Sequence, residues 1–314
     1  MRLNRREAMG GLAALAGSAL VATESMSQTA GNPRRYPLGL QFFTITGRER
    51  PLSWDEYSQR MAAAKQMGYD AIELAARWNH TPRQIRQRAD ELGLRIPSIH
   101  MGFDQMLAFF GPVQNVAEAQ DAVYWPLGIE QITRINIDAM HEFGCEYGVI
   151  GASGLANFKT IDAIKRLCEA FNHCAEQGKK AGIKIAYHMH ATDFEPVQGQ
   201  MPFEIMLRET GPDMYYQLDV CWAKAGGASP SDIIRRYHDR IVSFHLKDLD
   251  KENHPATPGD GTVDFRAIHD AVATVKDPLF FVERDQLAGR DPFVEARRSY
   301  QYLQTLGWGK APAA

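Results

Sequence analysis

Four expected strands in the second half of the chain each end in a side chain that can bind a metal ion or transfer a proton. Ile183–Tyr187 is followed by His188 and His190, Met214–Leu218 by Asp219, Ile241–Phe244 by His245, and Leu279–Val282 by Glu283. A divalent ion needs ionised carboxylates and neutral imidazoles held by a rigid frame, and these residue types meet that need. Asp219 could instead cap the following helix, and His245 could be a core histidine. Glu283 could pair with Arg284 or Lys247. Their common position at successive strand ends favours one shared site.

These residues share a site only if the surrounding elements bring the strand ends to one rim. From Tyr36 onward, strand and helix signals alternate along the chain. The four earlier strands are expected at Leu38–Thr44, Asp70–Leu74, Ile96–His100 and Glu146–Ile150. The helices are expected at Ser53–Met67, Thr81–Leu92, Ile129–Phe143, Thr160–Ala181, Pro202–Glu209, Pro230–His238, Phe265–Val275 and Asp291–Leu306.

Eight strand–helix units in about 275 residues are typical of a TIM barrel, whose chemistry lies at the carboxyl ends of the strands. A doubly wound sheet also alternates strand and helix, but no G-x-G-x-x-G follows the first strand. We therefore expect an α/β fold with a single (β/α)8 TIM-barrel domain over residues 36–308.

Composition excludes two classes of partner. The 314 residues are 45% hydrophobic and 23% charged, and the formal net charge is −3. Lys and Arg are scattered rather than clustered, so we expect no nucleic-acid partner. No apolar run approaches the ~20 residues of a membrane helix, so we expect no membrane insertion of the mature protein.

The first 30 residues read as a signal peptide and short linker. Arg5 and Arg6 precede a mildly apolar stretch from Gly10 to Ala22, a pattern typical of a twin-arginine export signal. A flexible basic tail is the alternative. The four cysteines show no C-x-x-C spacing, so free thiols are expected. We therefore expect a periplasmic protein that is exported already folded.

Short segments at the strand ends carry a family resemblance. They are YHMHATDF from Tyr187, LDVCW from Leu218, HLKD from His245, GDGTVDF from Gly259 and VERD from Val282. In their order and spacing the chain resembles the sugar phosphate isomerase/epimerase superfamily of xylose isomerase-like TIM barrels. The resemblance covers essentially all of Tyr36–Trp308.

The resemblance implies one divalent ion, held by residues from strands five to eight. The matching positions are His188, Asp219, His245 and Glu283. Mn²⁺ is the expected ion, and Mg²⁺, Co²⁺ and Zn²⁺ are the alternatives. Many epimerases of this family have a Glu where this chain has His188, so a two-glutamate proton relay is not expected. The chain resembles instead a branch with Tyr-His-Asn-His, in which Met189 replaces the Asn.

His190 stands two residues after His188 and so points to the same side of an extended strand. It is a candidate general acid/base, and Glu283 is its candidate partner. The reverse assignment, with His190 as the ligand, stays open. Lys247 could stabilise a developing oxyanion.

Four more residues are candidates for contact with a substrate. Glu73 and His100 end the second and third strands, where each could bind a sugar hydroxyl or act as a second base. A structural hydrogen bond within the barrel is the alternative for both. Trp222 and Phe43 could form an apolar wall against a sugar ring, or could simply be core residues.

Two connections at the same rim are long for simple loops: Met101–Tyr124 and Lys247–Val263. The first is aromatic and Met-rich, so it could cover a substrate. A subunit contact is the alternative, which would make the protein a homo-oligomer.

The expected activity is that of a metal-dependent sugar isomerase or epimerase. The ion would acidify a C–H beside a carbonyl, a base would remove the proton, and an enediolate would result. Loss of a β-substituent from a keto-sugar or 3-keto-glycoside would instead make the protein a lyase or dehydratase, and a non-catalytic sugar-binding barrel is a further alternative. The acidic mature chain argues against an endonuclease IV-like phosphodiesterase.

Overall fold

The structure, a computed structural model, describes residues 34–47, 51–102, 126–151, 158–284, 287 and 289–311. The expected signal at residues 1–30 and most of the connection 101–124 lie outside the described residues. Within the described part of the chain, every helix is too short or too polar to span a lipid bilayer.

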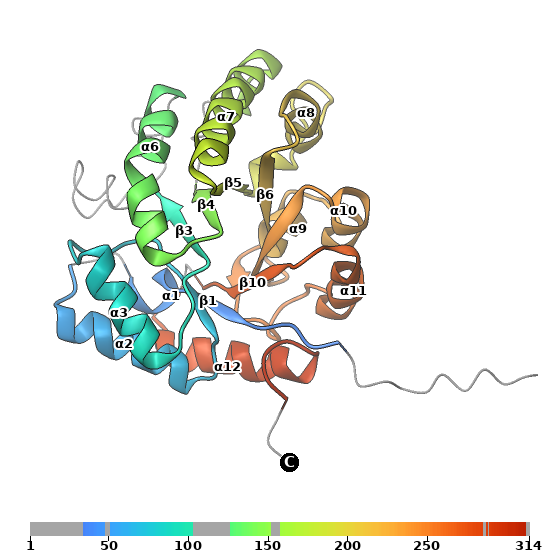
Figure 1. Ribbon diagram of the computed structural model, residues 1–314. Helices are drawn as coiled ribbons and strands as arrows, with labels where there is room; N and C mark the ends of the chain where they lie inside the picture. Colours follow the sequence, from blue (N-terminus) through green and yellow to red (C-terminus); the bar gives the residue numbers. More distant parts are fainter. Residues whose placement is uncertain are drawn as a thin grey trace, which may run out of the picture. The chain divides into compact units, whose positions relative to one another are not determined.

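Eight parallel strands form a nearly closed barrel with helices between them (Figure 1). The strands are β1 Gly39–Gln41, β2 Ala71–Glu73, β3 Ser98–Met101, β4 Tyr147–Ile150, β5 Lys184–His188, β6 Met214–Asp219, β7 Ile241–Leu246 and β10 Leu279–Val282. Their hydrogen-bonded order is β2-β1-β10-β7-β6-β5-β4-β3. Parallel bridges from Leu74 to Ile99 and from Ala71 to Arg95 join the two ends of this order. The expected TIM barrel is confirmed.

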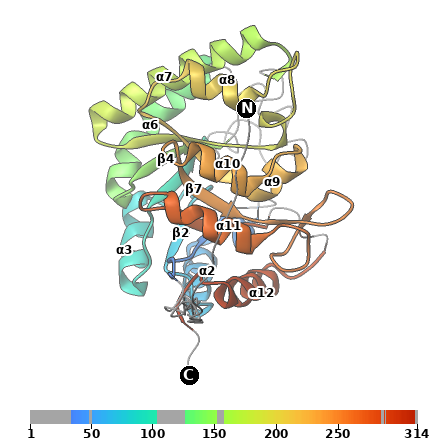
Figure 2. The same cartoon turned by 90° about the vertical axis from the view of Figure 1, so that its right-hand side faces the viewer.

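The helices lie outside the strands, and several that follow one another in the chain pack side by side (Figure 2). The longer ones are α2 Trp54–Gln66, α3 Pro82–Leu92, α6 Pro126–Phe143, α7 Ile161–Ala181, α8 Pro202–Glu209, α10 Pro230–Tyr237, α11 Phe265–Ala271 and α12 Pro292–Thr305. Short turns of helix are α1 Phe43–Thr46, α9 Val220–Ala225, and the 3-10 segments Ala191–Asp193 and Val272–Thr274.

The helix ends follow their capping residues. The Thr81 side chain accepts a hydrogen bond from the backbone N–H of Gln84, and Pro82 opens the first turn. Gly182 ends α7 in the left-handed region at φ 70°, where a residue with a Cβ would be strained.

Two expected elements differ from the structure. The first strand does not continue to Thr44, because the Gln41 side-chain oxygen accepts a hydrogen bond from the Phe43 N–H and the chain turns into α1. The connection Lys247–Val263 holds a two-stranded hairpin, β8 Asp248–Leu249 and β9 Pro255–Ala256. The Asp248 carboxylate accepts hydrogen bonds from three backbone N–H groups later in this connection, those of Gly259, Gly261 and Val263.

The barrel interior is layered. Because successive strand residues face opposite sides, Ala186 and Phe281 share the inward face of His188 and Glu283, which stand two residues later. They belong to a separate buried apolar cluster, Ala71, Tyr147, Val149, Ala186, Val242, Leu279 and Phe281. This apolar layer lies beneath the residues that end the strands, so the side chains that can do chemistry lie at one end of the barrel.

Candidate metal centre

The four residues expected to hold an ion come together at the carboxyl ends of consecutive strands. One ligand-type atom from each of His188, Asp219, His245 and Glu283 lies within 4.8 Å of the others. Three of these side chains are buried to 3% exposure or less, and Glu283 is 8% exposed. Each stands at or next to the carboxyl end of its strand, so the parallel barrel itself places the cluster.

A lysine lies among the acidic members of this cluster. The Lys247 Nζ is 2.9 Å from Asp219 Oδ2 and 2.5 Å from Glu283 Oε2, and the lysine is fully buried. Lys247 stands two residues after His245 and therefore shares its inward face. The other oxygen of Asp219 accepts hydrogen bonds from the N–H groups of Cys221 and Trp222, at 2.9 and 3.1 Å. Asp219 therefore both joins the cluster and caps α9.

Glu73 is a buried centre of hydrogen bonding beneath the cluster. His245 Nε2 lies 2.6 Å from Glu73 Oε2, and His100 Nε2 lies 3.1 Å from the same oxygen. Further donors come from Ser98, Gln41 and Gln217, at 2.6, 3.0 and 2.8 Å. Both carboxylate oxygens are engaged and the side chain is fully buried. These contacts favour the structural alternative for Glu73 over a role as a second base.

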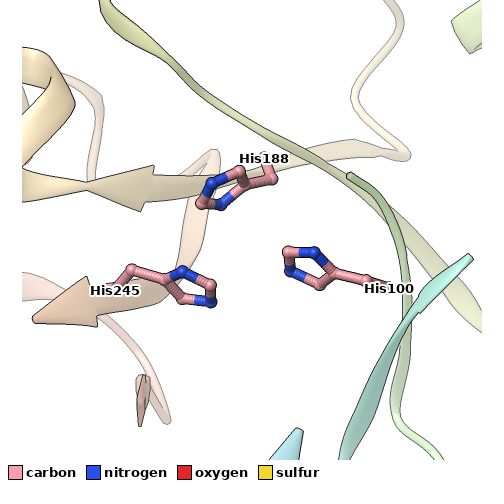
Figure 3. Close-up of side chains that lie close together, drawn as sticks. All are labelled: His100, His188 and His245. Atoms are coloured by element: carbon pink, nitrogen blue, oxygen red, sulfur yellow. The ribbon is translucent and has the colours of Figure 1, made fainter. Parts of the chain in front are cut away.

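Gln217 is the residue that the sequence did not reveal. Its amide oxygen lies 2.9 Å from His188 Nδ1 and 2.8 Å from His100 Nε2. Figure 3 shows the rings of His100, His188 and His245 converging from β3, β5 and β7 on one space. The available signal was spacing, because Gln217 stands two residues before Asp219 and so faces inward with it.

The charges of the centre shift its titration. Burial alone lowers the pKa of His245, but the carboxylates of Glu283 and Glu73 outweigh burial and raise that pKa to about 10. Burial raises the pKa of Glu283, but the cations of Lys247 and His245 together outweigh burial and hold the pKa well below its usual range. Burial lowers the pKa of His188 well below its ordinary value, so its ring is neutral at physiological pH. Positive charge at Lys247 and His245 thus balances the acidic groups.

His190 and Trp222 lie beside the cluster. The ring centres of His190 and His188 are 4.7 Å apart, and those of His190 and Trp222 are 6.2 Å apart. The Lys247 Nζ lies 5.1 Å from the centre of the Trp222 ring. Burial, and then the charge of Lys247, lower the pKa of His190 to about 4. Phe43 begins α1 just past the end of β1 and is half-buried, and its contact with a substrate stays a prediction.

The backbone of His190 is held by a buried acid. Asp193 accepts a 2.6 Å hydrogen bond from the His190 N–H and a 3.3 Å hydrogen bond from the Tyr187 hydroxyl. The Asp193 side chain is fully buried, and burial raises its pKa to about 8.

The donor set fits a divalent ion. His188 Nδ1 faces the Gln217 amide oxygen, so Nε2 of that ring remains for the ion. His245 Nε2 faces Glu73 Oε2 and its Nδ1 lies 3.1 Å from Glu283 Oε2, so an ion would replace the proton that Nδ1 shares with Glu283. Two imidazoles and two carboxylates suit Mn²⁺, Co²⁺ or Zn²⁺ better than the all-oxygen cations. His100, His188 and His245 form a second group of ligand-type residues, in which His100 Nε2 also faces the oxygens of Gln217 and Glu73.

The chain is similar to known proteins along most of its length. The model of a family described as "Xylose isomerase-like TIM barrel" matches residues 61–306. The inosose dehydratase of Geobacillus kaustophilus is 22% identical over 302 residues, which cover 82% of this chain and 92% of that protein. The inosose dehydratase of Lacticaseibacillus casei is 28% identical over 165 residues, which cover 46% of this chain and 55% of that protein.

Solved structures share the fold. A sugar phosphate isomerase/epimerase from Parabacteroides distasonis has a TM-score of 0.68 at 21% identity, covering 88% of this chain and 97% of its own. The IOLI protein with a bound zinc atom has a TM-score of 0.59 at 14% identity, covering 86% of this chain and 96% of its own. At these identities the likeness concerns the fold alone.

Proposed function

Because the chain belongs to the xylose isomerase-like TIM-barrel family, we propose that it is a divalent-metal-dependent enzyme acting on a polyhydroxylated carbonyl compound. The reaction begins with removal of the proton on the carbon beside the carbonyl. We propose that it continues with loss of the neighbouring hydroxyl, so that the protein is a dehydratase of a keto-sugar or cyclic keto-polyol. Isomerisation or epimerisation shares the first step and is the competing outcome.

The distribution of acid/base groups carries this proposal. Epimerisation needs proton carriers on both faces of one carbon, and the family's two-glutamate arrangement would supply them. Here β5 ends in His188, and both oxygens of Glu73 are engaged by buried donors. Glu283 is paired to Lys247 and His245. His190 is then the group best suited to move a proton.

A single histidine can serve an elimination. Neutral His190 accepts the proton from carbon, the electron pair of that C–H bond forms the new double bond, and the β-hydroxyl leaves. The imidazolium then returns the proton to the departing hydroxyl, which becomes water. Burial lowers the pKa of His190 to about 4, so the ring is neutral and able to accept a proton near neutral pH, and its protonated form readily gives that proton up.

The remaining residues of the centre bind and orient the substrate. A divalent ion held by His188, Asp219, His245 and Glu283 would supply Lewis-acid polarisation of the substrate carbonyl. Lys247 adds positive charge beside the oxygen on which negative charge develops. Trp222 offers an aromatic face next to His190, against which a ring of the substrate can lie.

The similarity to two inosose dehydratases supports the elimination and suggests the first substrate to test. An inosose is a cyclic polyol ketone, with a proton beside the carbonyl and a hydroxyl one carbon further on. The chain covers little more than half of the second of these relatives, so the substrate itself remains part of the proposal.

The proposal is tested by incubating the ion-loaded protein with an inosose in deuterated water, followed by mass spectrometry and ultraviolet absorbance. We expect a product lighter by one water that absorbs as a conjugated ketone. Deuterium gain at carbon without loss of water would replace the dehydratase with an isomerase or epimerase. If protein shown to hold an ion reacts with neither inososes nor keto-sugars, the proposal that it is an enzyme acting on such compounds is refuted.

A further inference from the structure

We propose that Gln217 is a positioning residue that selects Nε2 of His188 as the atom that binds the ion. The inference rests on the metal centre of the proposed function, but it concerns a residue that binds neither ion nor substrate. Gln217 is fully buried on β6, between the histidines of β3 and β5.

The orientation of the Gln217 amide follows from its neighbours. The carboxylate of Glu73 only accepts hydrogen bonds, so the atom of Gln217 that lies 2.8 Å from Glu73 Oε1 must be the NH₂ group. The same NH₂ group lies 2.8 Å from the Ser243 hydroxyl. Both amide hydrogens therefore have partners, and the amide oxygen points the other way.

That oxygen faces two imidazoles. It lies 2.9 Å from His188 Nδ1 and 2.8 Å from His100 Nε2. An amide oxygen accepts and cannot donate, so each of these nitrogens carries its hydrogen. His188 then holds its lone pair on Nε2, the nitrogen left for the ion in a cluster whose ligand-type atoms lie within 4.8 Å of one another. The tautomer of this ligand is therefore set by a neutral side chain.

The site discriminates between close replacements of Gln217. A Met would fill a similar volume but would leave two buried imidazole N–H groups without this acceptor, a cost of about 1–3 kcal/mol each. A Glu would place a second carboxylate 2.8 Å from the buried Glu73. Ser243 supplies a matched control, because its hydroxyl contacts the amide nitrogen and leaves the amide oxygen and its two histidine contacts in place.

The first experiment reads the tautomer directly. Long-range ¹H–¹⁵N spectra of histidine-labelled full-length protein, recorded free of metal near neutral pH, distinguish Nδ1–H from Nε2–H. The His188 signal is assigned by its loss in His188→Gln. We expect Nδ1–H at His188 in the wild type and in Ser243→Ala, and loss of this preference in Gln217→Met. A wild-type His188 that carries its hydrogen on Nε2 would overturn the inference.

The second experiment measures Zn²⁺ affinity by calorimetry, with circular dichroism to check folding. Removing a residue that orients a ligand typically lowers affinity about 10–100-fold, which we expect for Gln217→Met, whereas Ser243→Ala should change it much less. Equal affinity of Gln217→Met and wild type would contradict the role. A wild-type protein that binds no ion would refute the proposed function instead. The tautomer of His188 in the metal-free protein would still show whether Gln217 sets it. The tautomer of the wild type likewise decides it if Gln217→Met does not fold.

Discussion

Lys247 provides the sharpest test of the charge balance in the centre. Its ammonium lies between Asp219 and Glu283, at 2.9 and 2.5 Å, with no exposure to solvent. In Lys247→Met the side chain keeps much of its length but loses the charge, and two buried carboxylates are left facing each other. Removing one partner of a buried ion pair costs about 3–5 kcal/mol.

This loss of stability should lower the midpoint temperature of thermal unfolding by a measurable amount. At roughly 2–3 °C per kcal/mol for a barrel of this size, the metal-free variant should melt about 6–15 °C below the metal-free wild type. An ion present at 100 times its Kd stabilises the wild type by about 2.7 kcal/mol. At the same ion concentration the variant is stabilised more if its freed carboxylates bind the ion more tightly. Differential scanning calorimetry with and without Mn²⁺ gives both shifts.

The control is Lys179→Met, which removes an exposed ammonium 2.7 Å from Asp213. A surface pair of this kind contributes little, so its midpoint should match that of the wild type. If the metal-free Lys247→Met protein also unfolds at the midpoint temperature of the wild type, Lys247 does not balance the buried acids and the described centre is wrong.

Four further predictions follow from single residues. Asp219→Ala should abolish ion binding, measured by metal analysis, while circular dichroism still shows a folded barrel; full metal occupancy would contradict the ligand assignment. His190→Ala should lower turnover about 10²–10⁴-fold with unchanged metal content, and undiminished turnover would exclude it as the proton carrier. Burial raises the pKa of Asp193 from 3.8 to about 8, so the unfolded chain loses this proton first and stability falls as pH rises from about 4 to about 8, by at most roughly 5–6 kcal/mol. Asp193→Asn should flatten that slope in denaturant titrations, and an unchanged slope would assign it to other groups. We also propose export by the twin-arginine route, so replacing Arg5 and Arg6 with Lys should leave the precursor in the cytoplasm in a fractionation assay; unchanged export would point to another route.

The residues at the strand ends could be predicted from the sequence because two simple periodicities coincide there. Alternation along a strand places His245 and Lys247 on one face, and the strand–helix spacing brings β5, β6, β7 and β10 to one rim. The four ligand-type residues therefore followed from the sequence. Their clustering within 4.8 Å agrees with that expectation.

The polar layer beneath these residues could not be predicted from the sequence. Gln217, Ser243 and Ser98 are neutral side chains on buried strands. Spacing can place such residues on the inward face, as it does Gln217, but it does not show which of them contact the histidines and Glu73. The role of Glu73 depends on its contact with His245, which comes from a strand that does not neighbour β2 in the sheet. Contacts across a barrel depend on its closure and register, which local patterns do not encode.

The apolar layer under the ligands gives the barrel a closed floor. Among the described residues, Ala186, Val149 and Phe281 pack together there and are buried to 1% exposure or less, so we expect no through-route past the centre for solvent or product. A substrate would therefore enter, and its product leave, through the same end of the barrel, where the ligands lie. In the proposed dehydration, the released water and the larger organic product would share this one opening. The departure of that product would then control how long the water stays close enough to add back, and so how reversible each turnover is.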